Sequence, residues 1–107
     1  MAKVIDSMLA FLANRVTFVM ESKSASFTAA ANTAVSDDLS ISKAGYYPLG
    51  IVGVRLNGTG VSYMNVYHYY LNSASVGSGT VRYGLRNLGT ASVTGTVYFY
   101  VLWQKQS

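Results

Sequence analysis

The chain has 107 residues, of which 50% are hydrophobic and 11% are charged, and its formal net charge is +4 at pH 7. This length fits one domain. The charged fraction lies well below the roughly 25% of an average soluble domain, so we expect a Ser/Thr/Tyr-rich surface that is partly covered by neighbouring subunits. The absence of cysteine excludes a disulfide framework and a thiolate metal site.

The first predicted element is a short amphipathic helix at about residues 3–14, where apolar residues recur at helical spacing. Asp6 interrupts the apolar run, so a signal peptide is not expected, and no stretch approaches the length of a membrane span. A lone helix of this length is marginal in water, so its apolar stripe must pack on the rest of the chain or on copies of itself. We therefore divide the chain into residues 1–16, an anchor or packing element, and residues 17–107, a β-domain. The stripe contains Val4, Ile5, Met8, Leu9 and Leu12.

From residue 15 onward the apolar residues alternate with a period of two, which predicts β-strands. The sequence NGTG at residues 57–60 predicts a tight hairpin, and SASVGSG at residues 73–79 predicts a loop. About seven strands at intervals of this length predict an all-β protein, an antiparallel β-sandwich. The expected strand sequences are RVTFVM, SASFTA, VSDDLSIS, GIVGVRL, VSYMNVYHYYL, TVRYGLRN and ASVTGTVYFYVLW.

The only proline lies in GYYPLGIVGV, residues 45–54. Because proline cannot donate to a sheet ladder, Pro48 is expected where the chain enters a strand, after a turn at Gly45. Gly50 and Gly53 then lie inside the strand and should point to opposite faces. Each predicts a bend or the close approach of a backbone or an aromatic ring, and tyrosines of the neighbouring strand are candidates.

The last strand has two largely apolar faces. Alternation places Val93, Val97, Phe99, Val101 and Trp103 on its core face. A homo-oligomer interface is more apolar than ordinary surface, so we expect identical subunits to cover the second face. A single thicker core, covered by the N-terminal helix, is the alternative. The expected interface residues are Tyr63, Tyr67, Tyr69, Tyr98, Tyr100 and Leu102.

Residues that could carry chemistry are sparse. His68 is the only histidine, and a catalytic triad would require it to meet a serine and a distant acid. Strict alternation places His68 on one face with Val66 and Tyr70, and Tyr67 on the other. Asp37 and Asp38 are adjacent, so they point to opposite faces of a strand and cannot act as a glycosidase pair. No catalytic residue, metal ligand or cofactor is expected, and we do not expect an enzyme.

The runs SFTAAANTAVSDDLSISKAGYYPLGIVGVRLNGTG and GTVRYGLRNLGTASVTGTVYFYVLW resemble the small β-sandwich domains of tailed-phage and prophage virion appendages. The resemblance covers about residues 23–103. It implies a virion-surface structural module that is commonly trimeric and has no enzymatic activity. Its most specific part is a strand-entry motif that includes Gly45, Tyr46, Pro48, Gly50 and Gly53.

Only a short helix stands where a fibre shaft would be, so the resemblance favours a capsid decoration or short head-fibre subunit. This subunit would form a homotrimer on the virion surface, bound to the major capsid protein or other virion proteins, after synthesis in the bacterial cytoplasm. The alternative is a tail-fibre tip or glycan-binding module for host attachment, with Tyr69, Tyr70 or Trp103 as stacking platforms for sugar rings.

The basic charge is unevenly distributed, because all four acidic residues precede residue 39. We expect the outer face of residues 39–107 to favour anionic capsid or cell-surface groups. Arg82, Tyr83 and Arg86 could form an aromatic-basic surface for single-stranded nucleic acid, but such grooves carry denser runs of Lys and Arg. Nucleic acid is therefore not an expected partner.

Overall fold

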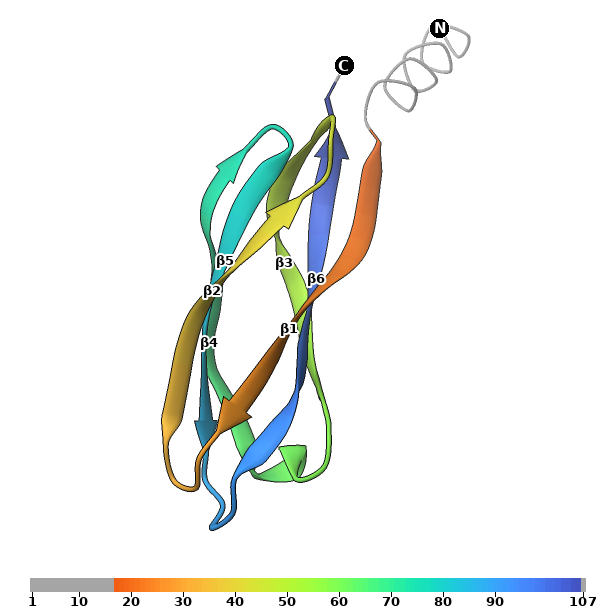
Figure 1. Ribbon diagram of the computed structural model, residues 1–107. Coiled ribbons are helices and arrows are strands. Elements are labelled where there is room, and N and C mark those ends of the chain that lie inside the picture. The colour runs from red at the N-terminus through yellow and green to blue at the C-terminus, as the bar shows by residue number, and fades with distance from the viewer. Residues whose placement is uncertain (1–16, 107) are drawn as a thin grey trace, which may run out of the picture.

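The computed structural model describes residues 17–106, and these form two antiparallel sheets of three strands each, with the orders β1-β6-β3 and β2-β5-β4. The sheets pack face to face (Figure 1), which confirms the all-β sandwich. The predicted N-terminal helix lies outside the described residues. The elements are β1 (Phe18–Ala29), β2 (Ala34–Ser42), β3 (Tyr46–Asn57), the 3-10 turn η1 (Val61–Tyr63), β4 (Met64–Ser75), β5 (Ser78–Asn87) and β6 (Val93–Lys105).

The described residues contain six strands rather than the seven expected, because FVM at residues 18–20 and SASFTA at residues 24–29 belong to one strand, β1. This strand pairs with β6 without interruption from Phe18 opposite Gln104 to Ala29 opposite Val93. The polar residues in its middle are tolerated because β1 is an edge strand, where inward-pointing charges are a common feature.

The expected hairpin at NGTG is wrong, because β3 and β4 belong to different sheets. Gly58 and Gly60 do adopt positive φ angles of 140° and 85°, but the turn carries the chain across the sandwich through η1. The tight hairpin lies instead in the expected SASVGSG loop. There Ser75 pairs with Ser78, and Val76 and Gly77 alone connect β4 to β5.

The core lies between the two central strands, β5 and β6. The predicted core face of the last strand is confirmed, since Val93, Val97, Phe99, Val101 and Trp103 are all buried. Burial of apolar side chains is the main favourable term in folding, at about 25 cal/mol per Å². Because Trp103 is fully buried, it cannot serve as the sugar-stacking platform that the sequence suggested. The facing residues from the other sheet include Ile41, Val81, Tyr83 and Leu85.

The position of Pro48 follows from β3 being an edge strand that hydrogen-bonds to β6 alone. Gly45 has a φ of 80° and supplies the turn before the strand, as predicted. Pro48 is the third residue of the strand, is buried, and lies opposite Trp103. Because no strand pairs with β3 on its open side, the missing N–H of Pro48 removes no ladder hydrogen bond there.

Two register shifts follow Pro48 and correct the expected orientation of the glycines. The shifts leave Leu49 and Val52 as extra residues, so that Gly50 lies opposite Leu102 and Gly53 lies opposite Tyr100. The extra residue Val52 lies between the two glycines, so they point to the same face although they are three positions apart. This is the outer face of the sheet. The predicted approach of a tyrosine is confirmed for Gly53, where a Cβ atom would lie 3.5 Å from the Tyr100 ring.

Strand β5 ends at the lower end of the sandwich in Figure 1, where one buried amide joins the β1–β2 and β5–β6 connections. The Asn87 side chain donates from Nδ2 to the carbonyl oxygens of Ala29 (3.0 Å), Ala30 (3.3 Å) and Ala91 (2.8 Å), and its Oδ1 accepts from the Gly89 N–H at 2.9 Å. A backbone hydrogen bond from Asn32 to Gly89 joins the same two connections, and one from Leu88 to Tyr63 adds the β3–β4 connection. Ladder hydrogen bonds stop where the strands end, and beyond that point the Asn87 side chain provides partners for backbone groups of the loops.

Replacing Asn87 should destabilise the fold strongly. We expect Asn87→Ala to lower the free energy of unfolding by about 2 to 4 kcal/mol, because buried carbonyl groups lose their donor. Asn87→Asp should cost more, since a carboxylate only accepts hydrogen bonds. Urea denaturation measures both changes, with the exposed Asn65→Ala as the control. Equal midpoints for all three variants would contradict the role given to Asn87.

At the opposite end, an ion cluster closes the rim between β1 and β2. Lys43 Nζ donates to Glu21 Oε2, and Lys23 Nζ lies 3.2 Å from Glu21 Oε1. Lys23 also donates to the Ser42 carbonyl at 3.1 Å, which links the two edge strands. The hydrogen bonds from Lys43 and Lys23 hold the pKa of the Glu21 carboxyl below its ordinary value of 4.5.

This lowered pKa predicts a pH dependence of stability. A carboxyl whose pKa is lower in the folded state stabilises the protein above its unfolded pKa, and this contribution is lost as the pH falls through the folded pKa. Wild-type protein should therefore lose stability as the pH falls below 4.5, and Glu21→Gln should lack that part of the loss. Thermal unfolding at a series of pH values provides the measurement, and parallel profiles for the two proteins would refute the prediction.

Candidate ligand-binding face

The outer face of the β2-β5-β4 sheet carries a group of aromatic and polar side chains. Two rows cross this face: Ser36, Gly84 and His68 in one, and Asp38, Arg82 and Tyr70 in the other. The residues come from three strands, so the sheet ladder fixes their spacing. They line a shallow depression of about 550 Å³, whose walls are Ser36, Asp37, Asp38, His68, Tyr70 and Arg82.

A bulge in β4 sets the orientation of the aromatic residues and corrects the strict alternation expected there. The register shifts between Val66 and His68, which leaves Tyr67 as the extra residue. Val66 therefore packs against the core, while His68 lies on the outer face with Tyr70. Tyr69 turns inward, with its ring centroid 6.2 Å from that of Phe99, so it is not placed as an outer platform for a sugar.

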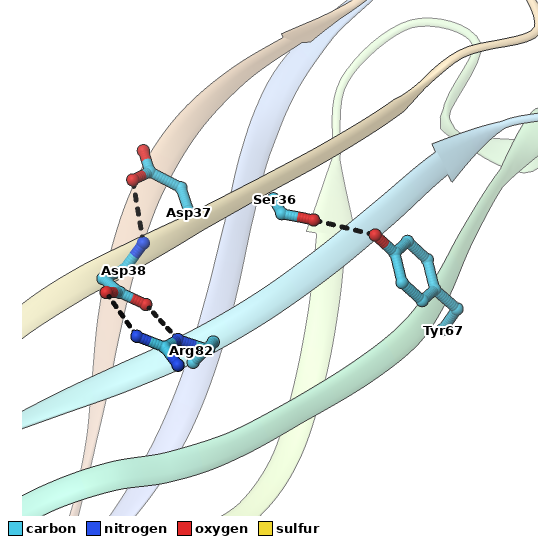
Figure 2. Close-up of polar contacts among 5 residues, drawn as sticks. All are labelled: Ser36, Asp37, Asp38, Tyr67 and Arg82. Carbon is cyan, nitrogen blue, oxygen red and sulfur yellow. Dashed lines mark hydrogen bonds and ion pairs between the residues drawn. The ribbon is translucent and has the colours of Figure 1, made fainter.

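Gly84 provides the space that the aromatic rings occupy. A Cβ atom at this position would lie 2.5 Å from His68 Cε1 and closer still to Tyr67 Cζ. Because no side chain fills this space, Tyr67 reaches across the sheet, and its hydroxyl lies 2.8 Å from Ser36 Oγ (Figure 2). Sequence analysis missed Gly84, although a glycine inside a strand is a known signal of close approach.

Tyr67, His68 and Tyr70 form a row of three rings. The Tyr67 and His68 centroids are 4.7 Å apart in an edge-to-face arrangement, and those of His68 and Tyr70 are 5.9 Å apart. Such geometries are favourable for aromatic pairs. Tyr67 and Tyr70 are each 46% exposed, so their rings are held in position yet remain open to a ligand.

A charged pair lies beside this row. Arg82 donates from Nε to Asp38 Oδ1 at 2.9 Å and from Nη2 to Asp38 Oδ2 at 3.2 Å, a bidentate arrangement visible in Figure 2. The hydrogen bonds from Arg82 hold the pKa of the Asp38 carboxyl below its ordinary value. Asp37 Oδ1 accepts the Asp38 N–H at 2.8 Å, so both aspartates have defined orientations.

The six expected interface residues are distributed over several surfaces of one chain. Tyr98, Tyr100 and Leu102 lie half-buried on the outer face of the β1-β6-β3 sheet, which is the face that their alternation predicted. Tyr67 belongs to the other sheet, Tyr69 points inward, and Tyr63 lies exposed in η1. A role in oligomerisation stays a prediction for all six.

The outer face of the β1-β6-β3 sheet also exposes apolar residues whose exposure the sequence analysis did not predict. Phe18 and Met20 on β1 are 54% and 59% exposed, and the bulged Leu49 and Val52 on β3 are 44% and 57% exposed. Met20 and Gly50 pair with Leu102 from its two sides. We call Phe18, Met20, Tyr100 and Leu102, with Leu49 and Val52 at the β3 edge, the apolar face.

Arg55 is the charged residue beside the apolar face, and it contacts tyrosines rather than an acid. Its guanidinium lies 4.3 Å from the centre of the Tyr98 ring, and its Nε donates to the Tyr100 hydroxyl at 3.2 Å. A cation over an aromatic ring is favourable, most of all where water is excluded. The two tyrosines are thereby fixed on the surface of the sheet.

Arg82 and Tyr83, which the sequence analysis weighed as part of a nucleic-acid surface and did not favour, do not lie on one open surface. Tyr83 is buried in the core at 2% exposure, and Arg82 is paired with Asp38. Within residues 17–106, no group of three or more His, Asp or Glu side chains is placed to hold a metal ion. That part of the chain also contains no helix long and apolar enough to cross a membrane.

Comparison with protein-family models, curated proteins and solved structures finds no match to this chain.

The Asp38–Arg82 pair gives a direct test of the geometry of this face. Replacing Arg82 with Met should raise the pKa of the Asp38 carboxyl towards 3.8, its ordinary value, because the donors that stabilise the charged form are removed. A titration followed by carboxyl ¹³C NMR measures this change, with Arg86→Met as the matched control on the same strand. An Asp38 pKa that is the same in wild type and in Arg82→Met would show that the pair does not form in solution.

Proposed function

We propose that the chain is a non-enzymatic structural protein of a tailed-phage virion, either a capsid decoration or a short head-fibre subunit. It would assemble as a homotrimer on the particle surface and bind the major capsid protein or other virion proteins. The resemblance of residues 23–103 to virion appendage domains supports the location and the trimer. The apolar face is the observation that carries the assembly.

The composition of the apolar face favours contact with another subunit. Soluble monomers rarely expose large contiguous apolar patches, and those that do commonly bind another protein there. In the row that joins Met20, Leu102 and Gly50, no charged residue is present. Such a surface matches the composition of homo-oligomer interfaces, whose buried centre is depleted in charge.

The edges of the same sheet favour face-to-face packing over pairing of strands. On β1, Glu21 and Lys23 point towards the rim of the sandwich and form the ion cluster. On β3, Pro48 and two register shifts interrupt the edge. Inward-pointing charges, proline and bulges all discourage edge-to-edge pairing. The subunits would therefore meet through the face of this sheet.

Substitutions on the apolar face should separate the subunits. We expect wild-type protein to sediment as a species of three 11.5 kDa chains. The double variant Met20→Lys/Leu102→Lys should sediment as a monomer, because buried charges without partners oppose association. Tyr70→Lys, on the other sheet, is the control and should remain associated. Sedimentation velocity on the full chain provides the measurement.

A wild-type chain that is monomeric and well folded at micromolar concentration would contradict the assembly. A variant that lacks residues 1–16 addresses the alternative that this segment covers the apolar face. If subunits cover it, the shortened chain should still associate. Imaging of particles with and without the protein, with a search for its density on the head or the tail, tests the virion location.

A further inference from the structure

We infer that the outer face of the β2-β5-β4 sheet is a binding site for a neutral saccharide. The ligand would lie in the depression lined by His68, Tyr70 and the Asp38–Arg82 pair, with the Tyr67 ring next to that of His68. The site is independent of the proposed assembly, because it occupies the sheet opposite the apolar face. Saccharide binding and self-association can therefore be tested, and can fail, separately.

The aromatic part of the site offers flat apolar surface that is already ordered. Tyr70 and Tyr67 are exposed on the outer face, and the apolar C–H face of a pyranose ring can stack on such a side chain, which presents an apolar body and a polar tip. The Ser36 hydroxyl and the His68 ring hold Tyr67 in place. A ligand would pay little entropy to order these rings, which favours binding.

The polar part of the site offers hydrogen-bonding groups in fixed positions. Arg82 holds both oxygens of the Asp38 carboxylate, but each oxygen has a second lone pair that can accept from a sugar hydroxyl. The side chains of both residues remain about half exposed, at 44% and 45%. A ligand can therefore reach acceptors on Asp38 and further N–H donors on Arg82 together, which suits adjacent hydroxyls that both donate and accept.

The charge of the depression selects the class of saccharide. Its lining includes two carboxylates, Asp37 and Asp38, and one guanidinium, Arg82. An anionic sugar would bring a further negative charge to a site that already has an excess of one, and like charges without partners oppose binding. This balance disfavours anionic ligands at this face, the phosphates of nucleic acid among them.

The test is an NMR titration of the isotopically labelled full-length protein. The probes are glucose, galactose, mannose, N-acetylglucosamine, maltose and lactose, with N-acetylneuraminic acid as the anionic comparison, each up to about 10 mM, a range that detects millimolar Kd values. At least one neutral sugar should shift the amide signals of residues 36–38, 67–70 and 82–84. N-acetylneuraminic acid should bind more weakly.

Variants then assign the contacts. Tyr70→Ala and Asp38→Ala should each weaken the binding about tenfold, equivalent to 1.4 kcal/mol. The control Tyr98→Ala removes an aromatic ring from the opposite sheet and should leave the Kd unchanged. Amide signals far from the depression should keep their wild-type positions, which verifies that each variant is folded. Tyr70→Phe keeps the aromatic ring and serves as the conservative comparison for Tyr70→Ala.

Several results would overturn the inference. These are the absence of shifts with every neutral sugar, shifts that lie away from the depression, stronger binding of N-acetylneuraminic acid, or equal Kd values for wild type, Tyr70→Ala and Asp38→Ala. Binding of a short single-stranded oligonucleotide to the same residues in place of sugars would assign the face to nucleic acid instead.

Discussion

The fold depends on the packing of β6 against β5, the central strands of two narrow sheets. Val97, Phe99, Val101 and Trp103 on β6 are fully buried, as are Val81 and Leu85 on β5. In a sheet of three strands only the middle one has neighbours on both sides, so burial is concentrated there and the edge strands are half-covered. The edge strands can therefore carry bulges, charges and a proline that a central strand would not tolerate.

Those bulges determine what each outer face presents. On β3 they leave Leu49 and Val52 exposed and align Gly50 and Gly53 under the β6 side chains. On β4 the extra residue Tyr67 is free to extend across Gly84 to β2. One sandwich thus has an apolar outer face on one sheet and an aromatic, hydrogen-bonding outer face on the other, so the proposed self-association and the proposed ligand binding would use separate surfaces.

The period-two alternation was sufficient to predict the sandwich and the buried face of the last strand, because β6 pairs with β1 without a register shift. Alternation failed where a bulge changes parity, as at Tyr67 and Gly53, since the sequence does not mark which residue is left unpaired. The hairpin predicted at NGTG was wrong for a different reason. Glycine dihedral angles define a local turn, but they do not determine which sheet the next strand joins. The Asp38–Arg82 pair depends on residues 44 positions apart, and no local pattern indicates it.

Hydrogen bonds between the connecting loops limit how the two sheets can move apart. At one end Asn87 and the backbone bonds of Asn32 and Leu88 join three connections. At the other, Gly77 donates to the Tyr46 carbonyl and accepts from the Lys43 N–H. The two layers cannot part at either end without breaking several of these bonds together. Loop amides that would ordinarily exchange quickly with solvent deuterium are therefore coupled to opening of the whole domain, and the same coupling gives proteases few local openings to attack.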